Sequence, residues 1–323
     1  MTGSIKEKLL GCPSIKSLRD ETSIAKTLSS LGWHSTVGPV YFDVSTNKLR
    51  EVDVRARRSW VTKSENPIQV NVQLLCETKT MSGYHIIFAD SPSQTPKSLL
   101  AMSYAVWAGN FGRENQDIML ESFTRAGIEQ DSADRLIDSF RQISYPDGFE
   151  RVQPFKTAPP DVPYSATTFK ETSVDKEKEL DNSVLWRASL VLNSVMESCR
   201  KHFDEETKLE FEFAAKHGVM NNSFIETFAG AYQRRVSGLK LFHPVIVLDA
   251  SLWMTSGDDI IETSCCRLIQ RSATDDAVLW YDVVTRDGFA DYAKSVTEYY
   301  DNKFIRAGGE ASSDVDEILS GIL

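Results

Sequence analysis

The chain has 323 residues, of which 41 % are hydrophobic and 10 % aromatic, and this apolar content excludes a chain that is disordered throughout. Its longest apolar stretches are too short or too interrupted to span a membrane, and the N-terminus lacks the apolar core of a secretory signal. Five cysteines, an odd number without zinc-ligand spacing, favour free thiols. We therefore expect a globular cytoplasmic protein with no membrane partner.

The formal net charge of −10 is unevenly distributed along the sequence. Residues 1–94 contain 12 Lys and Arg against 9 Asp and Glu, whereas the remainder contains 24 against 37. An acidic protein can still bind nucleic acid through a local basic surface, because affinity depends on the phosphates that are contacted. Arg55, Arg57, Arg58 and Lys63 are the candidate nucleic-acid contacts, and a solvated strand face is the alternative explanation.

Residues 14–94 have the pattern of one helix followed by short strands. Apolar residues recur at helical spacing from Leu18 to Leu31, Ser17–Asp20 resembles a capping box, and Gly32 is a natural stop. Runs rich in β-branched and aromatic residues, separated by turn-forming residues, then predict strands. These strands are expected at Pro39–Val44, Val52–Ala56, Val70–Cys76 and Tyr84–Ala89.

Residues 95–240 change to a helical pattern and are predicted to form a helical insertion. Within it, a loop at residues 145–172 holds five of the eleven prolines in the chain, and loops of this length usually have a functional or linking role. The expected helices are Lys97–Ala108, Asn115–Ala126, Ser132–Ile143, Leu180–His217 and Ser223–Val236.

Residues 241–307 return to strand character and end in a helix, and residues 308–323 form a tail in which acidic and apolar residues alternate. The sequence thus predicts an α/β protein whose mixed-sheet core, flanked by helices, is built from residues 14–94 and 241–307 around the insertion. The expected elements of the second half are strands at Val245–Leu248, Cys265–Gln270 and Val278–Thr285 and a helix at Gly288–Phe304.

Charged residues interrupt two of the predicted core strands. Glu77 and Lys79 share one face at the end of the Val70–Cys76 run, and Asp53 can lie beside them if the two strands pair. Buried carboxylates are costly unless they bind a metal or one another, and Mg²⁺ is typically held by one or two carboxylates together with waters. With a lysine to offset phosphate charge, these are the parts required for metal-assisted hydrolysis of a phosphodiester.

The order of these segments resembles the restriction-endonuclease-like, or PD-(D/E)xK, nuclease superfamily, and in particular its type IV restriction and defence-associated branch. The resemblance covers about residues 14–90. It rests on Glu21-x-x-Ile-Ala-x-x-Leu-x-x-x-Gly-Trp33, Tyr41-Phe-Asp43, Arg50-Glu-Val-Asp-Val-Arg-Ala56, Leu75-Cys-Glu-Thr-Lys79 and Ile86-Ile-Phe88. The Pro-Asp dipeptide of the family is absent, since Val52 precedes Asp53.

The resemblance implies a metal-dependent endonuclease in which Asp53, Glu77 and Lys79 form the hydrolytic centre, with Mg²⁺, or Mn²⁺ in its place, as cofactor. Many members add an acid from the preceding helix, and Glu21 lies on the apolar face of the predicted helix, where an acid is otherwise anomalous. Glu21, Asp53 and Glu77 are therefore the expected metal ligands. Duplex DNA is the expected substrate, in restriction or antiviral defence, and a homodimer or a defence-system protein is the kind of protein partner that the resemblance allows.

Two alternative interpretations fit the same charged residues. The chain could be a catalytically silent binding or assembly module on the same fold, or a structural protein whose charges form a surface salt bridge. Asp249, at the end of the Val245–Leu248 run, is more simply a turn residue than a functional one. The five histidines show no paired ligand spacing and are expected to be structural or exposed.

Overall fold

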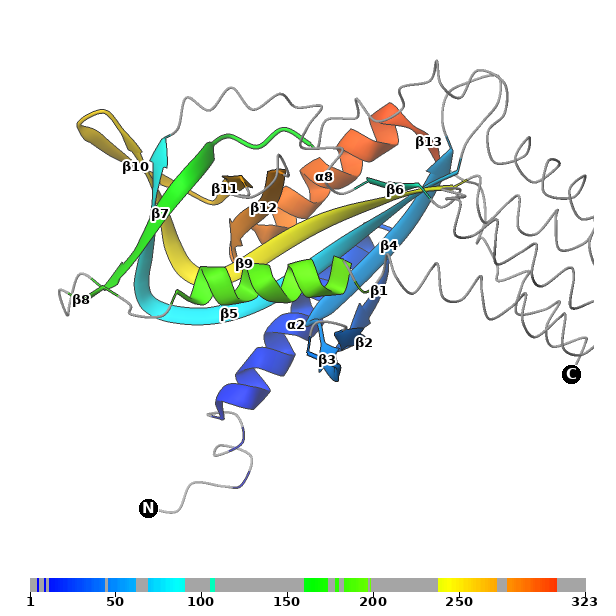
Figure 1. Cartoon of the computed structure of the whole chain (residues 1–323), viewed down its shortest axis with the longest axis horizontal. Coiled ribbons are helices and arrows are strands. Elements are labelled where there is room, and N and C mark those ends of the chain that lie inside the picture. The colour runs from blue at the N-terminus through cyan, green and yellow to red at the C-terminus, as the bar shows by residue number, and fades with distance from the viewer. Residues whose placement is uncertain are drawn as a thin grey trace, which may run out of the picture.

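The computed structural model describes residues 12–43, 46–61, 69–90, 105–107, 160–173, 178–179, 183–196, 238–271 and 278–306, together with the single residues 5, 9 and 198. These residues form a mixed α/β structure with one large mixed sheet, a separate two-stranded sheet and three helices (Figure 1). The helices are α2 (Pro13–Ser30), a helix at residues 184–196, and α8 (Phe289–Lys303).

The strands come from every part of the described chain. Those of the large sheet are β1 (His34–Val37), β4 (Val54–Val61), β5 (Gln69–Asp90), β6 (Ala105–Trp107), β7 (Ser165–Ser173), β8 (Lys178–Glu179), β9 (Gly238–Ser256), β10 (Asp259–Thr263), β11 (Cys265–Arg271), β12 (Val278–Thr285) and β13 (Ile305–Arg306). The two-stranded sheet is the hairpin of β2 (Val40–Asp43) and β3 (Lys48–Glu51).

Two long strands, β5 and β9, form the spine of the sheet. They run parallel to each other from the pair Gln69–Gly238 to the pair Ala89–Thr255, and both curve together, as Figure 1 shows. The register shifts between Thr80 and His85, where Gly83 adopts a φ of 81° that an L side chain rarely tolerates. The pairings of β5, β7, β11, β12 and β9 close on themselves, because β9 pairs in turn with β5.

The free edge of β5 positions the candidate site. On that edge β4 pairs with β5 only up to Cys76, and β7 begins to pair with it only at His85. Between these two points neither strand covers the edge, whereas β9 pairs with the opposite edge up to Thr80 and again from His85. Glu77 and Lys79 therefore lie where the sheet opens.

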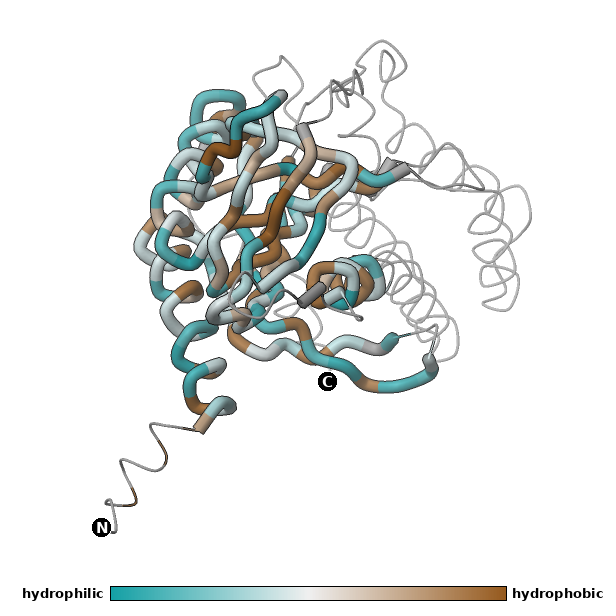
Figure 2. Tube along the Cα trace, turned by 90° about the vertical axis from the view of Figure 1, so that its left-hand side faces the viewer, coloured by the Kyte–Doolittle hydropathy of each residue, from teal (hydrophilic) through white to brown (hydrophobic). Residues whose placement is uncertain are grey.

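Helices cover both faces of the sheet. The 184–196 helix packs its stripe of Leu185, Ala188, Leu192 and Val195 against one face. Helices α2 and α8 pack on the other, through residues such as Leu28 and Val296. In Figure 2 the hydrophobic segments concentrate in the middle of the sheet and on the helix sides that face it. This burial of apolar surface on both faces is the main source of stability of the fold.

A carboxylate from the sheet fixes the start of the 184–196 helix. The Glu171 side chain in β7 is buried and accepts hydrogen bonds from the backbone N–H groups of Val184, at 3.0 Å, and Leu185, at 2.8 Å. It also accepts one from the Ser183 hydroxyl at 2.8 Å. Free N–H groups at a helix N-terminus bind anions well, so this contact anchors the helix to the sheet.

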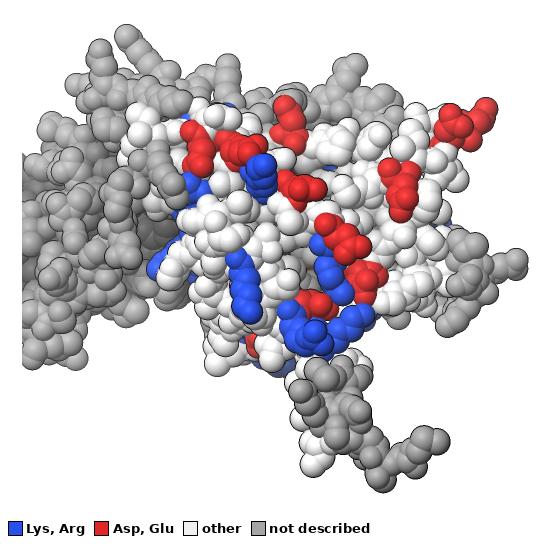
Figure 3. All heavy atoms as spheres, turned by 180° about the vertical axis from the view of Figure 1, so that it is seen from behind, with Lys and Arg blue, Asp and Glu red and all other residues white. Residues whose placement is uncertain are grey.

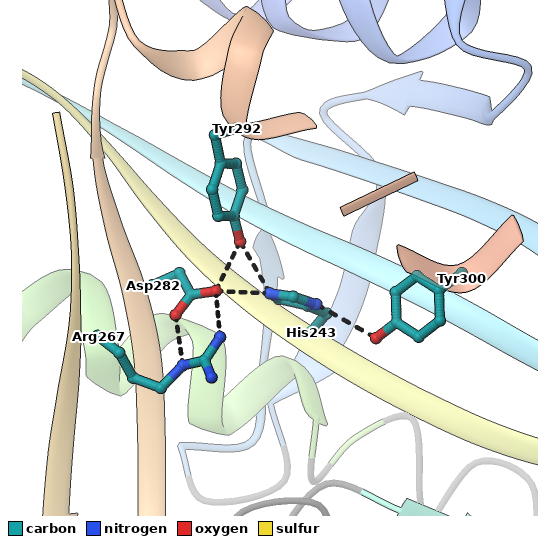
Figure 4. A network of polar contacts seen from close by, with 5 residues as sticks. All are labelled: His243, Arg267, Asp282, Tyr292 and Tyr300. Carbon is teal, nitrogen blue, oxygen red and sulfur yellow. Dashed lines mark hydrogen bonds and ion pairs between the residues drawn. The ribbon is translucent and has the colours of Figure 1, made fainter. Parts of the chain in front are cut away.

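A buried polar network joins β9, β11, β12 and α8 (Figure 4). Arg267 forms a two-pronged ion pair with Asp282 at 2.7 and 2.8 Å, and the His243 ring and the Tyr292 hydroxyl each bond the same carboxylate at 2.8 Å. Although burial opposes it, the Arg267 guanidinium holds the pKa of Asp282 well below its ordinary value, while burial lowers the pKa of His243. Since a carboxylate only accepts, His243 Nε2 donates to it, and Nδ1 accepts from Tyr300 at 3.3 Å.

The structure confirms most of the elements expected at both ends of the chain. The predicted strands at Pro39–Val44, Val70–Cys76 and Tyr84–Ala89 correspond to β2 and β5, and Gly32 ends α2 with a φ of 82°. The strand at Val245–Leu248 lies beside the one at Val70–Cys76, as a single core built from both ends requires. The later elements match β11, β12 and α8.

Three predictions about local structure were wrong. Helix α2 begins at Pro13 with Cys12 as its N-cap, so Ser17–Asp20 is not a capping box. The expected helix Lys97–Ala108 ends in β6, and the expected loop at residues 145–172 includes most of β7. β7 pairs with β5 and β11, so part of the presumed insertion belongs to the sheet.

Most of residues 95–240 lie outside the described part of the chain. The 184–196 helix lies within the predicted helix Leu180–His217. The predicted helices Asn115–Ala126, Ser132–Ile143 and Ser223–Val236 fall outside the described residues, and so does the tail at 308–323.

Candidate functional site

Glu21, on helix α2, is the predicted site residue that comes first in the chain. Its neighbours along the buried stripe of the helix are Ile24, Ala25 and Leu28, as the sequence pattern predicted, and Glu21 itself is only 9 % exposed. The Ser17 hydroxyl, one turn earlier, donates a 2.8 Å hydrogen bond to Glu21 Oε1. Burial raises the pKa of Glu21, and the Asp53 carboxylate raises it further, whereas Lys79 lowers it. Glu21 thus lies within electrostatic reach of both.

Asp53 stands at the point where the chain enters β4. Its Oδ2 accepts hydrogen bonds from the Thr78 backbone N–H at 2.6 Å and from the Thr78 hydroxyl at 2.8 Å. The carbonyl of Asp53 accepts a bond from the Gly38 N–H at 2.9 Å. The uncovered edge of β5 therefore offers its free N–H to Asp53, which fixes that carboxylate beside Glu77 and Lys79.

The Lys79 ammonium lies near the carboxylates of both Asp53 and Glu77. Its Nζ lies 2.5 Å from Glu77 Oε1 and 4.0 Å from Asp53 Oδ2. The Glu77 side chain is 5 % exposed, whereas those of Asp53 and Lys79 are 22 % and 29 % exposed. The structure thus brings the three predicted residues together, with Glu77 on the inside and the other two open to solvent.

Glu77 carries the largest electrostatic perturbation in this cluster. Burial raises its pKa to about 7, the Asp53 carboxylate contributes in the same direction, and Lys79 opposes both. Its Oε2 is buried without a hydrogen-bond partner among the described residues. A buried, unpartnered carboxylate oxygen is costly, so its presence needs an explanation beyond packing.

The chemistry of these donors fits a hard cation. The polar contacts of Asp53 fall on Oδ2, and Lys79 bonds Oε1 of Glu77, so Asp53 Oδ1 and Glu77 Oε2 are the oxygens available to a cation. Mg²⁺ is commonly held by one or two carboxylates with several waters. Within the described part of the chain, no three His, Cys, Asp or Glu side chains form a ready-made metal site, so Glu21 does not complete a three-acid cage.

The structure separates the predicted nucleic-acid contacts. Arg57 is exposed on β4, and Arg55, half-buried on the same face, donates to Gln73 Oε1 at 3.0 Å. Arg58 lies on the opposite face, only 7 % exposed, and bonds the Leu31 carbonyl at 2.7 Å. Lys63 falls outside the described residues.

The burial and the contacts of Arg58 argue against its predicted role as a nucleic-acid contact. Its guanidinium pairs with both oxygens of Asp301 at 2.9 and 3.1 Å and stacks over the Trp60 ring at 5.0 Å. These contacts hold α8 and the end of α2 against the sheet. Arg58 is thus a packing residue, and a nucleic-acid surface would have to rely on Arg55 and Arg57.

Sequence reasoning missed a second charged cluster on the other flank of α2. Asp249 lies within β9 rather than in a turn, accepts a bond from Ser82 at 2.8 Å, and pairs with Lys16 at 2.8 Å. Arg286 approaches Asp249 at 3.5 Å and pairs with Asp20 at 2.7 Å. The hydrogen bond from Lys16 lowers the pKa of Asp249. A pocket of about 560 Å³ lies against Asp249 and Arg286.

On the face seen in Figure 3, acidic and basic side chains lie next to one another rather than in separate patches. In the Asp249 cluster, too, each base has an acidic neighbour. The signal in the sequence was an acid at the end of an apolar strand. A turn residue gives the same signal, so sequence alone did not distinguish the two.

Thr78 was also missed, because nothing in the Glu77-Thr-Lys79 triplet shows that the middle residue holds Asp53.

Comparison of the chain with known protein families, with curated proteins and with solved structures finds no match. The site is therefore interpreted from its own geometry. No helix in the described ranges is both long and apolar enough to cross a membrane.

Proposed function

We propose that the protein is a metal-dependent nuclease that hydrolyses phosphodiester bonds of DNA, on a core of the restriction-endonuclease-like type. The observation that carries this proposal is the cluster of Asp53, Glu77 and Lys79 at the open edge of β5, with Glu77 Oε2 buried and unpartnered. A structural salt bridge would account for Lys79 and one carboxylate. It would not account for the unpartnered oxygen or for the buried acid Glu21.

Each residue has a role that its surroundings support. Asp53 Oδ1 and Glu77 Oε2 would hold Mg²⁺ or Mn²⁺, which when bound would polarise the phosphate and lower the pKa of a bound water. The Lys79 ammonium is fixed beside both carboxylates and partly open to solvent, so it can stabilise the negative charge that develops on the phosphate. Glu21, held by Ser17, adds negative charge near the cation without being one of its two main ligands.

Arg55 and Arg57 extend from β4 on the strand face opposite Arg58 and are the proposed contacts to the DNA backbone. Such contacts position a duplex without reading its sequence, and they make binding weaken as salt concentration rises. A role in restriction or antiviral defence, with a homodimer or a defence-system protein as partner, is the biological setting that we propose for this activity.

The proposal is tested by incubating the protein with supercoiled plasmid, linear duplex and single strands in Mg²⁺, Mn²⁺ or EDTA. We expect cleavage of duplex DNA with either metal and none in EDTA, because the carboxylates alone cannot neutralise the phosphate. Asp53→Asn should stop cleavage, and excess Mn²⁺ should restore part of it, since the substitution weakens one metal ligand. Duplex binding without cleavage under every metal condition would instead identify a catalytically silent binding module.

A further inference from the structure

The β2–β3 hairpin extends from the fold beside the candidate site. Its two strands form a sheet of their own, and Figure 1 shows them projecting from the ends of β1 and β4. All four residues of β3 are exposed. At the base of the hairpin the Gly38 N–H donates to the Asp53 carbonyl at 2.9 Å, and the Val52 N–H donates to the Pro39 carbonyl at 3.2 Å. The hairpin is therefore joined to the backbone of Asp53 itself.

An irregularity between β3 and β4 decides which side chains share a face. Side chains alternate along a strand, so strict alternation would put Arg50 and Arg55 on opposite faces. In the structure, however, Val52 packs in the same core as Leu75, whereas Val54 packs in the core on the other face of the sheet. The alternation is thus interrupted between Val52 and Val54, where the chain passes from β3 to β4.

Basic side chains consequently lie on one side of the sheet both before and after the candidate site in the chain. Arg50 is the register partner of Tyr41, whose ring packs against the core that contains Leu75. Arg55 is the register partner of Leu75 itself, and Glu77 follows Leu75 by two residues on the same strand. Directly paired residues share a face, and so do residues two apart. The basic residues on this side are therefore Lys48, Arg50, Arg55 and Arg57.

The two bases of the hairpin are accessible to a ligand. Lys48 is exposed. Arg50 Nε pairs with the buried Asp43 carboxylate at 2.6 Å, and the Arg50 side chain is still 45 % exposed. This ion pair holds the guanidinium in place, so Arg50 loses less conformational freedom when it binds an anion. Glu51, the acid of β3, alternates with Arg50 and lies on the opposite face.

We propose that the β2–β3 hairpin is a second contact to the backbone of duplex DNA, in which Lys48 and Arg50 bind phosphates on the side of the candidate site opposite Arg55 and Arg57. The inference rests on the proposed function. Phosphate contacts position a duplex, so contacts on both sides of Asp53 would hold the bond to be cleaved at the cation site. A two-stranded β-ribbon is also narrow enough to lie in the major groove.

Lys48→Ala tests this through duplex binding in EDTA, a measurement that does not involve cleavage. Loss of one phosphate contact should make the slope of log affinity against log salt concentration shallower by about 0.9, and should weaken binding about five- to tenfold at about 0.1 M salt. Adding Arg57→Ala should double the change in slope, because the two contacts are separate. The unfolding temperature of Lys48→Ala should equal that of wild type, since Lys48 is exposed.

Lys26→Ala is the matched control, since Lys26 is an exposed lysine on α2, which covers the opposite face of the sheet. It should change neither the affinity for duplex DNA nor the salt slope. If Lys48→Ala behaves like this control while Arg57→Ala weakens binding, the hairpin does not contact DNA and the inference is overturned. If the wild-type protein binds no duplex DNA at any salt concentration, the proposed function fails first, and the role of the hairpin fails with it.

Discussion

Lys79→Ala should reduce the rate of DNA cleavage about 10²–10³-fold while the protein still folds and binds duplex DNA. Lys79 is the cation fixed between Asp53 and Glu77, so its charge matters most where negative charge develops on the phosphate. The methylene stem is partly exposed, and its loss leaves no large cavity. Single-turnover cleavage rates and duplex binding at several salt concentrations measure the two effects separately.

Lys294→Ala provides the control, because Lys294 is an exposed lysine on α8 that is likewise paired with an acid, Glu298. Its substitution should leave cleavage within the range of wild type. Excess Mn²⁺ should not rescue Lys79→Ala, in contrast to Asp53→Asn, because the lysine is not a metal ligand. If the wild-type protein cuts DNA and Lys79→Ala cuts it equally fast, the charged cluster has only a structural role.

Glu77→Gln should stabilise the metal-free protein at pH 8 by about 2–3 kcal/mol. The pKa of Glu77 is raised to about 7 in the folded protein, above its ordinary value of 4.5, so the folded state favours the protonated form. The stability that this preference contributes is fully present below pH 4.5 and is lost as pH rises through 7. A glutamine has no charge to desolvate, so the variant avoids this loss.

The difference in unfolding free energy between variant and wild type should therefore be small near pH 4.5 and reach its full size above pH 7. Denaturant unfolding in EDTA across this pH range measures it. Glu51→Gln is the matched control, since Glu51 is an exposed acid in the same region and its substitution should change stability by less than about 0.5 kcal/mol at any pH. A Glu77→Gln variant that is no more stable than wild type at pH 8 would show that Glu77 is not a desolvated charge.

Individual helices and strands could be predicted from sequence, because each one shows in the spacing of apolar residues within a short segment. The helical stripe from Ile24 to Leu28 reflects one buried face, and the apolar run Val70–Cys76 reflects a strand that is buried on both faces. Both elements are confirmed. The position of β7 could not be predicted, since Ser165–Ser173 is rich in Ser and Thr and gains its strand conformation from pairing with β5 and β11. Tertiary pairing overrides weak local propensity in such segments.

The candidate site, too, contains residues that could be predicted from sequence and residues that could not. Glu21 was predictable because an acid within an apolar helical stripe stands out, and the Asp53, Glu77 and Lys79 set because two neighbouring strands carry it. The burial of Arg58 was not predictable, because alternation shows that Arg57 and Arg58 face opposite ways but not which face α8 covers. Thr78 was not predictable at all, since its significance depends on a contact across the fold.

The most direct test of the metal-dependent site is a calorimetric titration of the wild-type protein with Mn²⁺ at pH 8, where Glu77 is ionised. We predict that Mn²⁺ binds through Asp53 and Glu77, that its affinity decreases as pH falls through 7 because a proton then competes for Glu77, and that Asp53→Asn abolishes binding at the same concentrations. Mn²⁺ binding that is equally tight in wild type, Asp53→Asn and Glu77→Gln, or absent from all three, would contradict the account.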